Sequence, residues 1–344
     1  MKADGGGGIK GYGLEVIGYR MMGELIKTKR YKSAKEFLRD ISYEGEMYQN
    51  LKDGFVFRGH QLGSYKLIPS VLRHKLVQRD AAGNIVEDEK DAPFNLAGSE
   101  FIQKNVEYLE LRNFFNICDK SGLRLPQVNR IRHTLFNNHD IISFFLNGDD
   151  WLPNDLQELA ALAQHYGMET RLLDWTTNID IAIYFAVHKN PQLTEEEKAD
   201  KDSEYVAIWA LNIPMVSFNM NSPLRIIRPP YYGNPNLAAQ KGLFTFWNIP
   251  GLKLPLTPAN NEDNKVFLEL FKRMTNRKPL NELIEEECKK QGINEVVMWK
   301  LLIPRNDRKE LYEFIRKRNV NAAHLFPGYE GAVQCIREDR SFGF

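Results

Sequence analysis

Apolar residues in the first half of the chain recur mostly at helical spacing. Ser33 opens a Ser-Ala-Lys-Glu sequence of the capping-box type, so a helix is predicted to begin there and to carry Phe37 and Leu38 inward. A longer helix is predicted from Ser99 onwards, because its apolar residues lie near a 3.6-residue period: Phe101, Val106, Leu109 and Phe114. The same spacing predicts two further helices, at residues 131–146 and 155–165.

A strongly apolar run from Ile179 to Val187 is also predicted to be helical. Either Thr177 or Asn178 would cap it, since both side chains can accept a hydrogen bond from the first turn. The apolar face of this helix would consist of Ile179, Ala182, Ile183, Phe185 and Ala186.

Short β-branched and aromatic runs in the chain predict buried strands. These runs are Phe55–Phe57, Tyr205–Leu211, Leu224–Ile227 and Val296–Ile303. The charged stretches at 76–98 and 194–202 are expected to be surface loops, and a last helix is expected over Asp307–Arg318, followed by a loop. The pattern predicts an α+β fold, with a helical N-terminal part packed on a mixed β-sheet core.

Composition restricts the class of protein further. The chain has 344 residues, 43% of them hydrophobic and 26% charged, as in globular proteins that fold in water. We expect a flexible segment over residues 1–30 and a single domain over 31–344, with a helical insertion at about 76–160. A net charge of +1 argues against strong general attraction to nucleic acid or to a membrane surface.

Location and metal content follow from what the sequence lacks. No apolar run is long enough for a transmembrane helix, and the N-terminus has no apolar signal-peptide core. The cysteines are few, odd in number and widely spaced: Cys118, Cys288 and Cys335. They predict neither a disulfide framework nor a zinc site, so a cytoplasmic protein without a bound metal is expected.

The densest group of chemically active side chains lies within residues 164–177. Its members are Gln164, His165, Tyr166, Arg171, Asp174, Trp175, Thr176 and Thr177. Gly167 is predicted to end the preceding helix beside His165, which is either a donor, base or ligand, or a structural histidine. Trp175 either lines a pocket or fills the core, and the hydroxyls of Thr176 and Thr177 precede a helix, a place suited to an anion such as a pyrophosphate.

Arg58 is the second candidate for chemistry. It lies between Phe57 and Gly59 at the end of a predicted strand, where the chain can turn or be closely approached. Arginine suits a phosphate because it donates two parallel hydrogen bonds. Alternatively, Arg58 pairs with a buried carboxylate such as Asp174, which could itself pair with Arg171.

Two later segments add a polar residue each. Gln240 lies in LAAQKGLFTF, where alternating polar and apolar residues around Gly242 predict the start of a strand or a bulge. Gln240 either contacts a ligand or satisfies backbone groups. Glu330 lies in LFPGYEGAV, where Pro327 and Gly328 predict a turn; it is a candidate acid, or an exposed loop glutamate.

These motifs resemble those of the FRG family, named for its Phe-Arg-Gly motif. The resemblance extends from Phe55 to Val333 and comprises F-R-G at 57–59, the Q-H-Y-G to D-W-T block at 164–176, A-x-Q-K-G-x-F at 238–244 and L-F-P-x-x-x-G at 325–331. It implies a bacterial or phage-related cytoplasmic protein, in some members linked to phage defence or toxin systems.

A weaker resemblance is to ADP-ribosyltransferases of the Arg-Ser-Glu type, which implies NAD as the cofactor. Arg58 would then hold an NAD phosphate or ribose, and Thr176 would orient Arg58 and the nicotinamide ribose. Gln240 stands where that family has a glutamate, and Glu330 could substitute for it. The implied NAD-binding residues are Arg58, Gly59, His165, Tyr166, Arg171, Asp174, Trp175 and Thr177.

Two other functions remain open. The same residues could form a non-catalytic pocket for a nucleotide or a modified nucleic acid, since an aromatic ring beside arginines suits a base and its phosphate. They could also be structural, with Arg58, Arg171 and Asp174 in a buried ion network. The acceptor of a transferase reaction, protein or nucleic acid, is not identified by the sequence.

Overall fold

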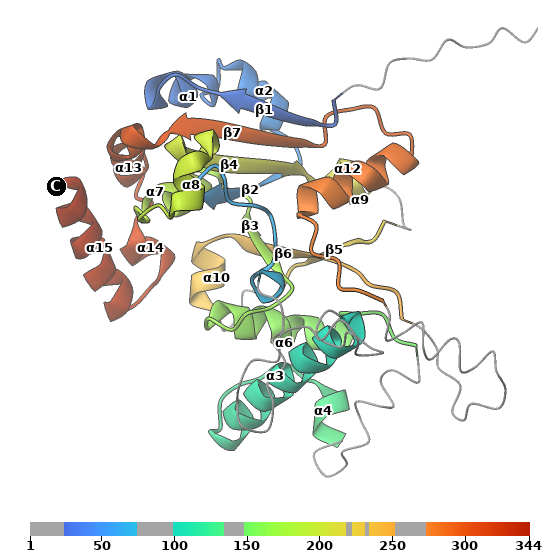
Figure 1. Cartoon of the computed structure of the whole chain (residues 1–344). Helices are drawn as coiled ribbons and strands as arrows, with labels where there is room; N and C mark the ends of the chain where they lie inside the picture. Colours follow the sequence, from blue (N-terminus) through green and yellow to red (C-terminus); the bar gives the residue numbers. More distant parts are fainter. Residues whose placement is uncertain (1–23, 74–98, 134–147, 218–221, 231–233, 252–272) are drawn as a thin grey trace, which may run out of the picture.

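A computed structural model describes residues 24–73, 99–133, 148–217, 222–230, 234–251 and 273–344. A seven-stranded mixed sheet with the order β1-β7-β4-β2-β3-β6-β5 forms its centre (Figure 1). Only β1 and β7 are parallel, and all other neighbouring strands are antiparallel. The predicted α+β class with a mixed sheet is therefore confirmed.

The seven strands lie between residues 26 and 304 of the chain. They are β1 (Ile26–Arg30), β2 (Phe55–His60), β3 (Leu173–Thr176), β4 (Tyr205–Asn212), β5 (Leu224–Ile227), β6 (Gly242–Trp247) and β7 (Met298–Pro304). The central strand β4 is buried on both faces because its side chains alternate between two cores. Val206 and Ile208 enter one core, while Ala207 and Trp209 enter the other.

Helices cover both faces of this sheet and extend beyond one end of it (Figure 1). The first face is covered by α1 (Ala34–Asp40), α2 (Glu46–Leu51), α7 (Ile179–Val187), α13 (Arg308–Lys317), α14 (Ala322–Leu325) and α15 (Tyr329–Phe342). The second face is covered by α9 (Ile213–Ser217) and α12 (Leu280–Lys290). Shorter elements are α8 (Glu195–Ala199), α10 (Pro235–Ala239) and the 3-10 turns Ser70–Leu72, Lys201–Glu204 and Arg305–Asp307.

A helical lobe packs on strands β5 and β6. It contains α3 (Glu100–Lys120), α4 (Asn129–His133) and α6 (Asn154–His165), which lie together below the sheet in Figure 1. Its core joins Tyr108, Phe115 and Leu156 to Phe244 and Phe246 of β6. The helical and strand parts are thus interleaved in sequence, since β1 and β2 precede the lobe.

Several predicted elements are confirmed. Ser33 caps α1 and accepts from the Glu36 amide, although the Glu36 carboxylate bonds the Lys32 amide and not that of Ser33. Asn178, not Thr177, caps α7. The helices predicted after Ser99, at 155–165 and at 307–318 and the strands predicted at 205–211, 224–227 and 296–303 are present within two residues of their predicted bounds. The strand predicted at 55–57 is present but continues to His60.

Other predictions are wrong. The predicted flexible N-terminus extends too far, because residues 26–30 form the edge strand β1. The stretch 194–202, predicted as a loop, contains the helix α8, which begins with a capping box at Thr194. Asp202 of this stretch forms ion pairs with Arg30 and Lys300. The turn predicted at Pro327 and Gly328 is present, but the residues after it form the helix α15 and not a loop.

Helix α3 buries only part of the expected face: Phe101 and Phe114 pack against the lobe core. Leu109 is exposed, whereas the buried side includes the charged residues Glu100, Lys104 and Glu107. Tyr108, Leu111 and Phe115 are buried on the same side, so apolar contacts and ion pairs share this interface, and hydrophobic spacing alone did not predict the ion pairs. The predicted loop at 76–98 and most of the predicted helix at 131–146 lie outside the described residues.

No helix among the described residues has the length and apolar character needed to cross a lipid bilayer.

Candidate functional site

A cavity of about 340 Å³ opens beside the junction of β2 and β3. Strands β2, β3 and β6, helices α6, α7 and α10, and Phe326 all contribute to its wall. Its polar lining residues include Arg58, Gln164, His165, Asp174, Thr176 and Gln240. The structure therefore brings Arg58 and Gln240, which are 182 positions apart in the chain, to the wall of one cavity.

The cavity forms where the sheet opens. The register between β2 and β3 consists of a single pair, Phe57 with Thr176, although both strands continue beyond it. Beyond this pair, the side chain of Arg58 replaces a backbone donor of the ladder: its Nη1 donates to the backbone carbonyl of Asp174 at 2.7 Å. A side-chain donor thus satisfies a carbonyl that the strand ladder leaves unpaired.

Two further contacts fix the guanidinium of Arg58. Its Nη1 lies 2.8 Å from Oδ1 of Asp174, and its Nε donates to Nε2 of His60 at 3.0 Å. Nη2 has no acceptor among the described residues, so it can donate to a ligand. Arg58 is therefore both paired with Asp174, as one of the two sequence interpretations predicted, and placed at the cavity wall.

His60 is a neutral support for Arg58. Burial and then the charge of Arg58 lower the pKa of His60 to about 3. A neutral imidazole with its proton on Nδ1 donates to the Tyr65 carbonyl at 3.2 Å and accepts from Arg58 at Nε2. The tautomer follows from these two partners, because Nε2 faces a donor.

Asp174 carries a negative charge at the cavity. Desolvation acts to raise its pKa, but the charge and hydrogen bond of Arg58 outweigh this and lower the pKa below its ordinary value. Gln164 donates to the same carboxylate at 3.2 Å and accepts in turn from Thr170. The Asp174 side chain is 57% exposed, so the anion is held in position and is still accessible.

Thr176 and Gln240 are both anchored by local bonds. The Thr176 hydroxyl accepts from the Asn178 amide at 3.1 Å, just before α7 begins. Gln240 ends α10, and its Nε2 donates to the Leu325 carbonyl at 3.2 Å, which ties α10 to α14. Gln240 satisfies a backbone group, as one sequence interpretation expected, and it also faces the cavity.

His165 and Trp175 differ in how far they face the cavity. The amide Nδ2 of Asn236 donates to Nε2 of His165 at 3.2 Å, and burial lowers the pKa of His165, which favours its neutral form. Trp175 borders the cavity, but its ring is 3% exposed and its Nε1 donates to Thr245 at 2.8 Å. Trp175 is thus mainly a core residue.

Three other predicted residues do not line this cavity. Tyr166 is 73% exposed at the end of α6, and Thr177 is also exposed. Arg171 is 4% exposed and lies in the lobe interface, where it pairs with Glu100 and Glu107. The prediction that Arg171 pairs with Asp174 is wrong. Side chains alternate along this segment, so Leu173 and Trp175 face the core while Asp174 faces the cavity, away from Arg171.

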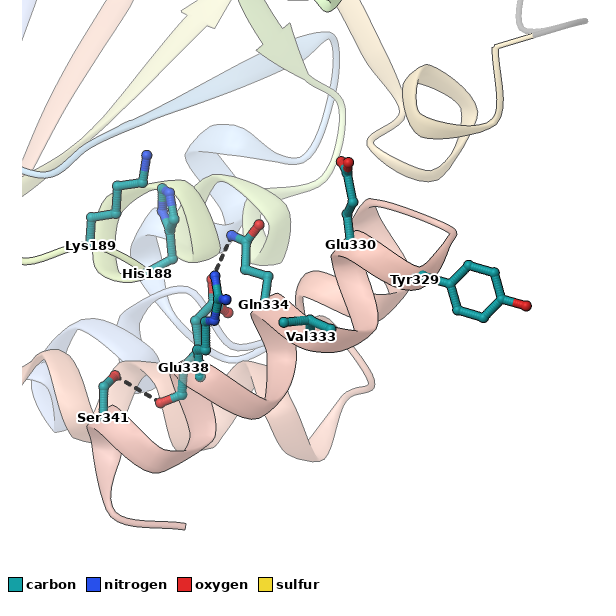
Figure 2. A pocket seen from close by; sticks show the side chains of 9 residues that line it. His188, Lys189, Tyr329, Glu330, Val333, Gln334, Glu338 and Ser341 are labelled. Carbon is teal, nitrogen blue, oxygen red and sulfur yellow. Dashed lines mark hydrogen bonds between the residues drawn. The ribbon is translucent and has the colours of Figure 1, made fainter.

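Glu330 belongs to a neighbouring groove of about 790 Å³ between the end of α7 and α15 (Figure 2). It lies in the first turn of α15, and Figure 2 shows its carboxylate pointing away from the Gln334–Glu338 pair. His188 lines both this groove and the cavity, so the two adjoin. Glu330 is therefore near the site but not in the same cavity as Arg58.

Some lining residues were missed by the sequence interpretation. They are Gln61, His188, Asn236 and Phe326. Each lies outside the polar cluster at 164–177, and no spacing relates them to Arg58 before the chain folds. Among the described residues, no group of three or more His, Cys, Asp or Glu side chains could hold a metal ion.

In a comparison with known protein families, residues 119–195 match the family model of the FRG domain. The match spans less than a quarter of the 344 residues and includes α6, β3 and α7. No curated protein and no solved structure matches the chain. The resemblance to ADP-ribosyltransferases therefore stays a prediction.

The FRG domain supplies only part of the cavity. Gln164, His165 and Asp174 come from it, whereas Arg58 and Gln240 lie outside the matched residues. The cavity is thus built by the FRG domain together with strands that precede and follow it in the chain.

Proposed function

We propose that the protein binds NAD in this cavity and breaks its nicotinamide–ribose bond, as an ADP-ribosyltransferase-like or otherwise NAD-consuming protein. One observation carries the proposal: Arg58, Thr176 and Gln240, which come from distant segments, line the same cavity. Their order along the chain is the one that the transferase resemblance implies.

Each side chain has a role that its contacts support. Arg58, fixed by His60 and Asp174, presents Nη2 to a phosphate or a ribose oxygen of NAD. Thr176 lies beside the N-terminus of α7, where a hydroxyl can orient the ribose. Because each of these groups is already held in place, little reorganisation accompanies the reaction.

Asp174 is the carboxylate that we assign to the chemical step. When nicotinamide leaves with the electron pair of the C1′–N bond, positive charge develops on the ribose. An ionised Asp174 at the cavity wall stabilises that charge, which the neutral amide of Gln240 does less well. Water or an acceptor then adds to C1′ and releases a proton to solvent.

A non-catalytic nucleotide-binding module is the second candidate. The observation that favours it is the pairing of Asp174 with Arg58, which offsets part of the carboxylate charge, together with the neutral residue at 240. Such a protein would bind NAD or another nucleotide with the same dependence on Arg58 and would leave it intact.

The test is to incubate purified protein with NAD, with and without cell lysate, and to measure free nicotinamide. Arg58→Ala is expected to lower the rate by on the order of 100-fold, because a preorganised donor is lost. Arg30→Ala is the matched control: it removes another arginine–aspartate pair of the same sheet, Arg30 with Asp202, away from the cavity.

The outcomes separate the two candidates. Release that is lost in a folded Arg58→Ala protein and kept in Arg30→Ala supports NAD cleavage. Arg58-dependent binding of intact NAD without nicotinamide release supports the binding module. A protein that depletes NAD in its own cell would act as a toxin or in phage defence, the setting that the FRG resemblance suggests.

A further inference from the structure

A second cavity, of about 470 Å³, adjoins the first. The two share four lining residues, which are Arg58, Gly59, Gln61 and Phe185. The rest of the second wall comes from His60, the last residue of β2, and from the segment that follows it, with Tyr65, Lys66, Ile68 and Arg73. Arg58 therefore stands at the boundary between two compartments.

The second cavity is lined by positive charge. Three of its nine lining residues are cationic, Arg58, Lys66 and Arg73, and none is an aspartate or glutamate. His60 adds no charge, since its pKa is lowered to about 3 by burial and by Arg58. The carboxylate that neutralises Arg58, on Asp174, lines the first cavity and not the second.

Arg58 and Arg73 are close enough to affect each other. Desolvation is the main cause that lowers the pKa of Arg73, and the charge of Arg58 lowers it further, while Asp174 and Glu169 act in the opposite direction. The Nε of Arg73 donates to the Ile68 carbonyl at 3.0 Å, which holds the guanidinium beside the segment after β2. Two neighbouring cations at one wall favour an anion between them.

We propose that this second cavity is a diphosphate subsite, in which Arg58, Lys66 and Arg73 bind the phosphates of a nucleoside diphosphate group. This subsite rests on the proposed function in one respect: if the ligand is NAD, its nicotinamide ribose occupies the first cavity. Tyr65 and Phe185 provide aromatic surface for the base attached to the diphosphate. NAD then spans both cavities, with its pyrophosphate at Arg58.

A compact diphosphate fits better than a polynucleotide. Arg58, Lys66 and Arg73 line one cavity, and the net charge of the whole chain is only +1. Long polyanions are bound through many phosphate contacts along a basic face. A nucleoside diphosphate needs only the few donors that these three side chains supply.

The experiment measures binding of inorganic pyrophosphate, ADP, AMP and adenosine to the full chain by calorimetry. We expect ADP to bind more tightly than AMP, and AMP more tightly than adenosine. The double variant Lys66→Gln/Arg73→Gln should lose about tenfold in ADP and pyrophosphate affinity, because charge-assisted bonds are removed. Lys35→Gln/Arg39→Gln, which removes two exposed cations from α1, should bind as the wild type does.

The subsite is overturned if adenosine binds as tightly as ADP, or if the Lys66/Arg73 variant binds ADP and pyrophosphate as the wild type does. Nicotinamide release tests the proposed function separately. Pyrophosphate binding that depends on Lys66 and Arg73, without NAD cleavage, keeps the subsite and refutes the enzyme. Cleavage with an unchanged KM for NAD in the double variant keeps the enzyme and refutes the subsite.

Discussion

At the residue scale, the central feature is the way in which Arg58 is held. Its guanidinium is fixed by a neutral acceptor on one side, His60, and by an anion on the other, Asp174. The side chain is only 13% exposed, yet it lies at the wall of both cavities. A buried neutral histidine is therefore part of the support of a functional cation.

His60 makes the stability of the protein depend on pH. The folded protein keeps His60 neutral because its pKa is lowered to about 3, whereas the unfolded chain takes up a proton near the ordinary value of about 6.5. Unfolding thus binds a proton below that value, and acid favours it. Between pH 7 and pH 5 we expect the wild type to lose roughly 2 kcal/mol more unfolding free energy than His60→Gln.

Urea unfolding of both proteins at the two pH values measures this difference. His324→Gln is the control, because His324 is exposed on α14, and it should follow the wild type. Equal losses in the wild type and in His60→Gln would show that His60 is not held neutral in the folded protein.

At the element scale, helix α7 lies against strand β2 without space for a side chain at Gly59. A Cβ atom there would lie 1.9 Å from the Ala182 carbonyl oxygen and 2.7 Å from the Ala186 nitrogen. The glycine of the Phe-Arg-Gly motif is thus needed for close backbone approach and not for a turn, since β2 continues to His60. This contact sets the distance between Arg58 and α7.

Gly59→Ala is expected to lower the unfolding free energy by about 3 kcal/mol or more, because helix backbone cannot move aside as a flexible side chain can. Thermal and urea unfolding measure the loss. Gly122→Ala is the control, because no atom lies within 4 Å of the added Cβ. Only the left-handed backbone, with φ of +69°, disfavours alanine there, and we expect it to lower the unfolding free energy by about 1 kcal/mol. Equal losses for both variants would contradict the packing explanation.

At the scale of the whole molecule, a buried ion network joins the helical lobe to the sheet. Arg171, just before β3, pairs with Glu100 at 2.8 Å and with Glu107 at 2.7 Å, and all three side chains are at most 6% exposed. Trp151 also donates to Glu107 at 2.8 Å. The network holds α3 against the segment that carries Asp174 to the cavity.

Arg171→Ala should therefore cost about 3–5 kcal/mol, since it leaves two carboxylates buried without their cation. Arg130→Ala is the matched control, because Arg130 also bridges two carboxylates, Asp149 and Asp155, but at a more exposed place in the lobe. We expect it to cost about 1 kcal/mol or less. Calorimetric or urea unfolding compares the two, and a loss at Arg171 no larger than that at Arg130 would refute the role of the network.

By itself, the sequence predicted the polar cluster at 164–177, the strands β2, β4, β5 and β7, and the helices α1, α3, α6, α7 and α13, but not β1, β3 or α12. These features depend on neighbours in the chain: a cap at Thr177 or Asn178, of which the structure uses Asn178, the left-handed Gly167 that ends α6, and the apolar run of β4. Local hydrogen bonds and side-chain periodicity are enough to specify them.

Only the tertiary structure decided the partners of the charged residues. Arg171 meets Glu107, 64 positions earlier, while Asp174 meets Arg58, 116 positions earlier. Side chains on the two sides of β3 point to opposite faces of the sheet, so neighbours in sequence are separated in space and distant residues are brought together. The cavity itself exists because the β2–β3 ladder ends after one pair, a property of how strands meet that no local pattern encodes.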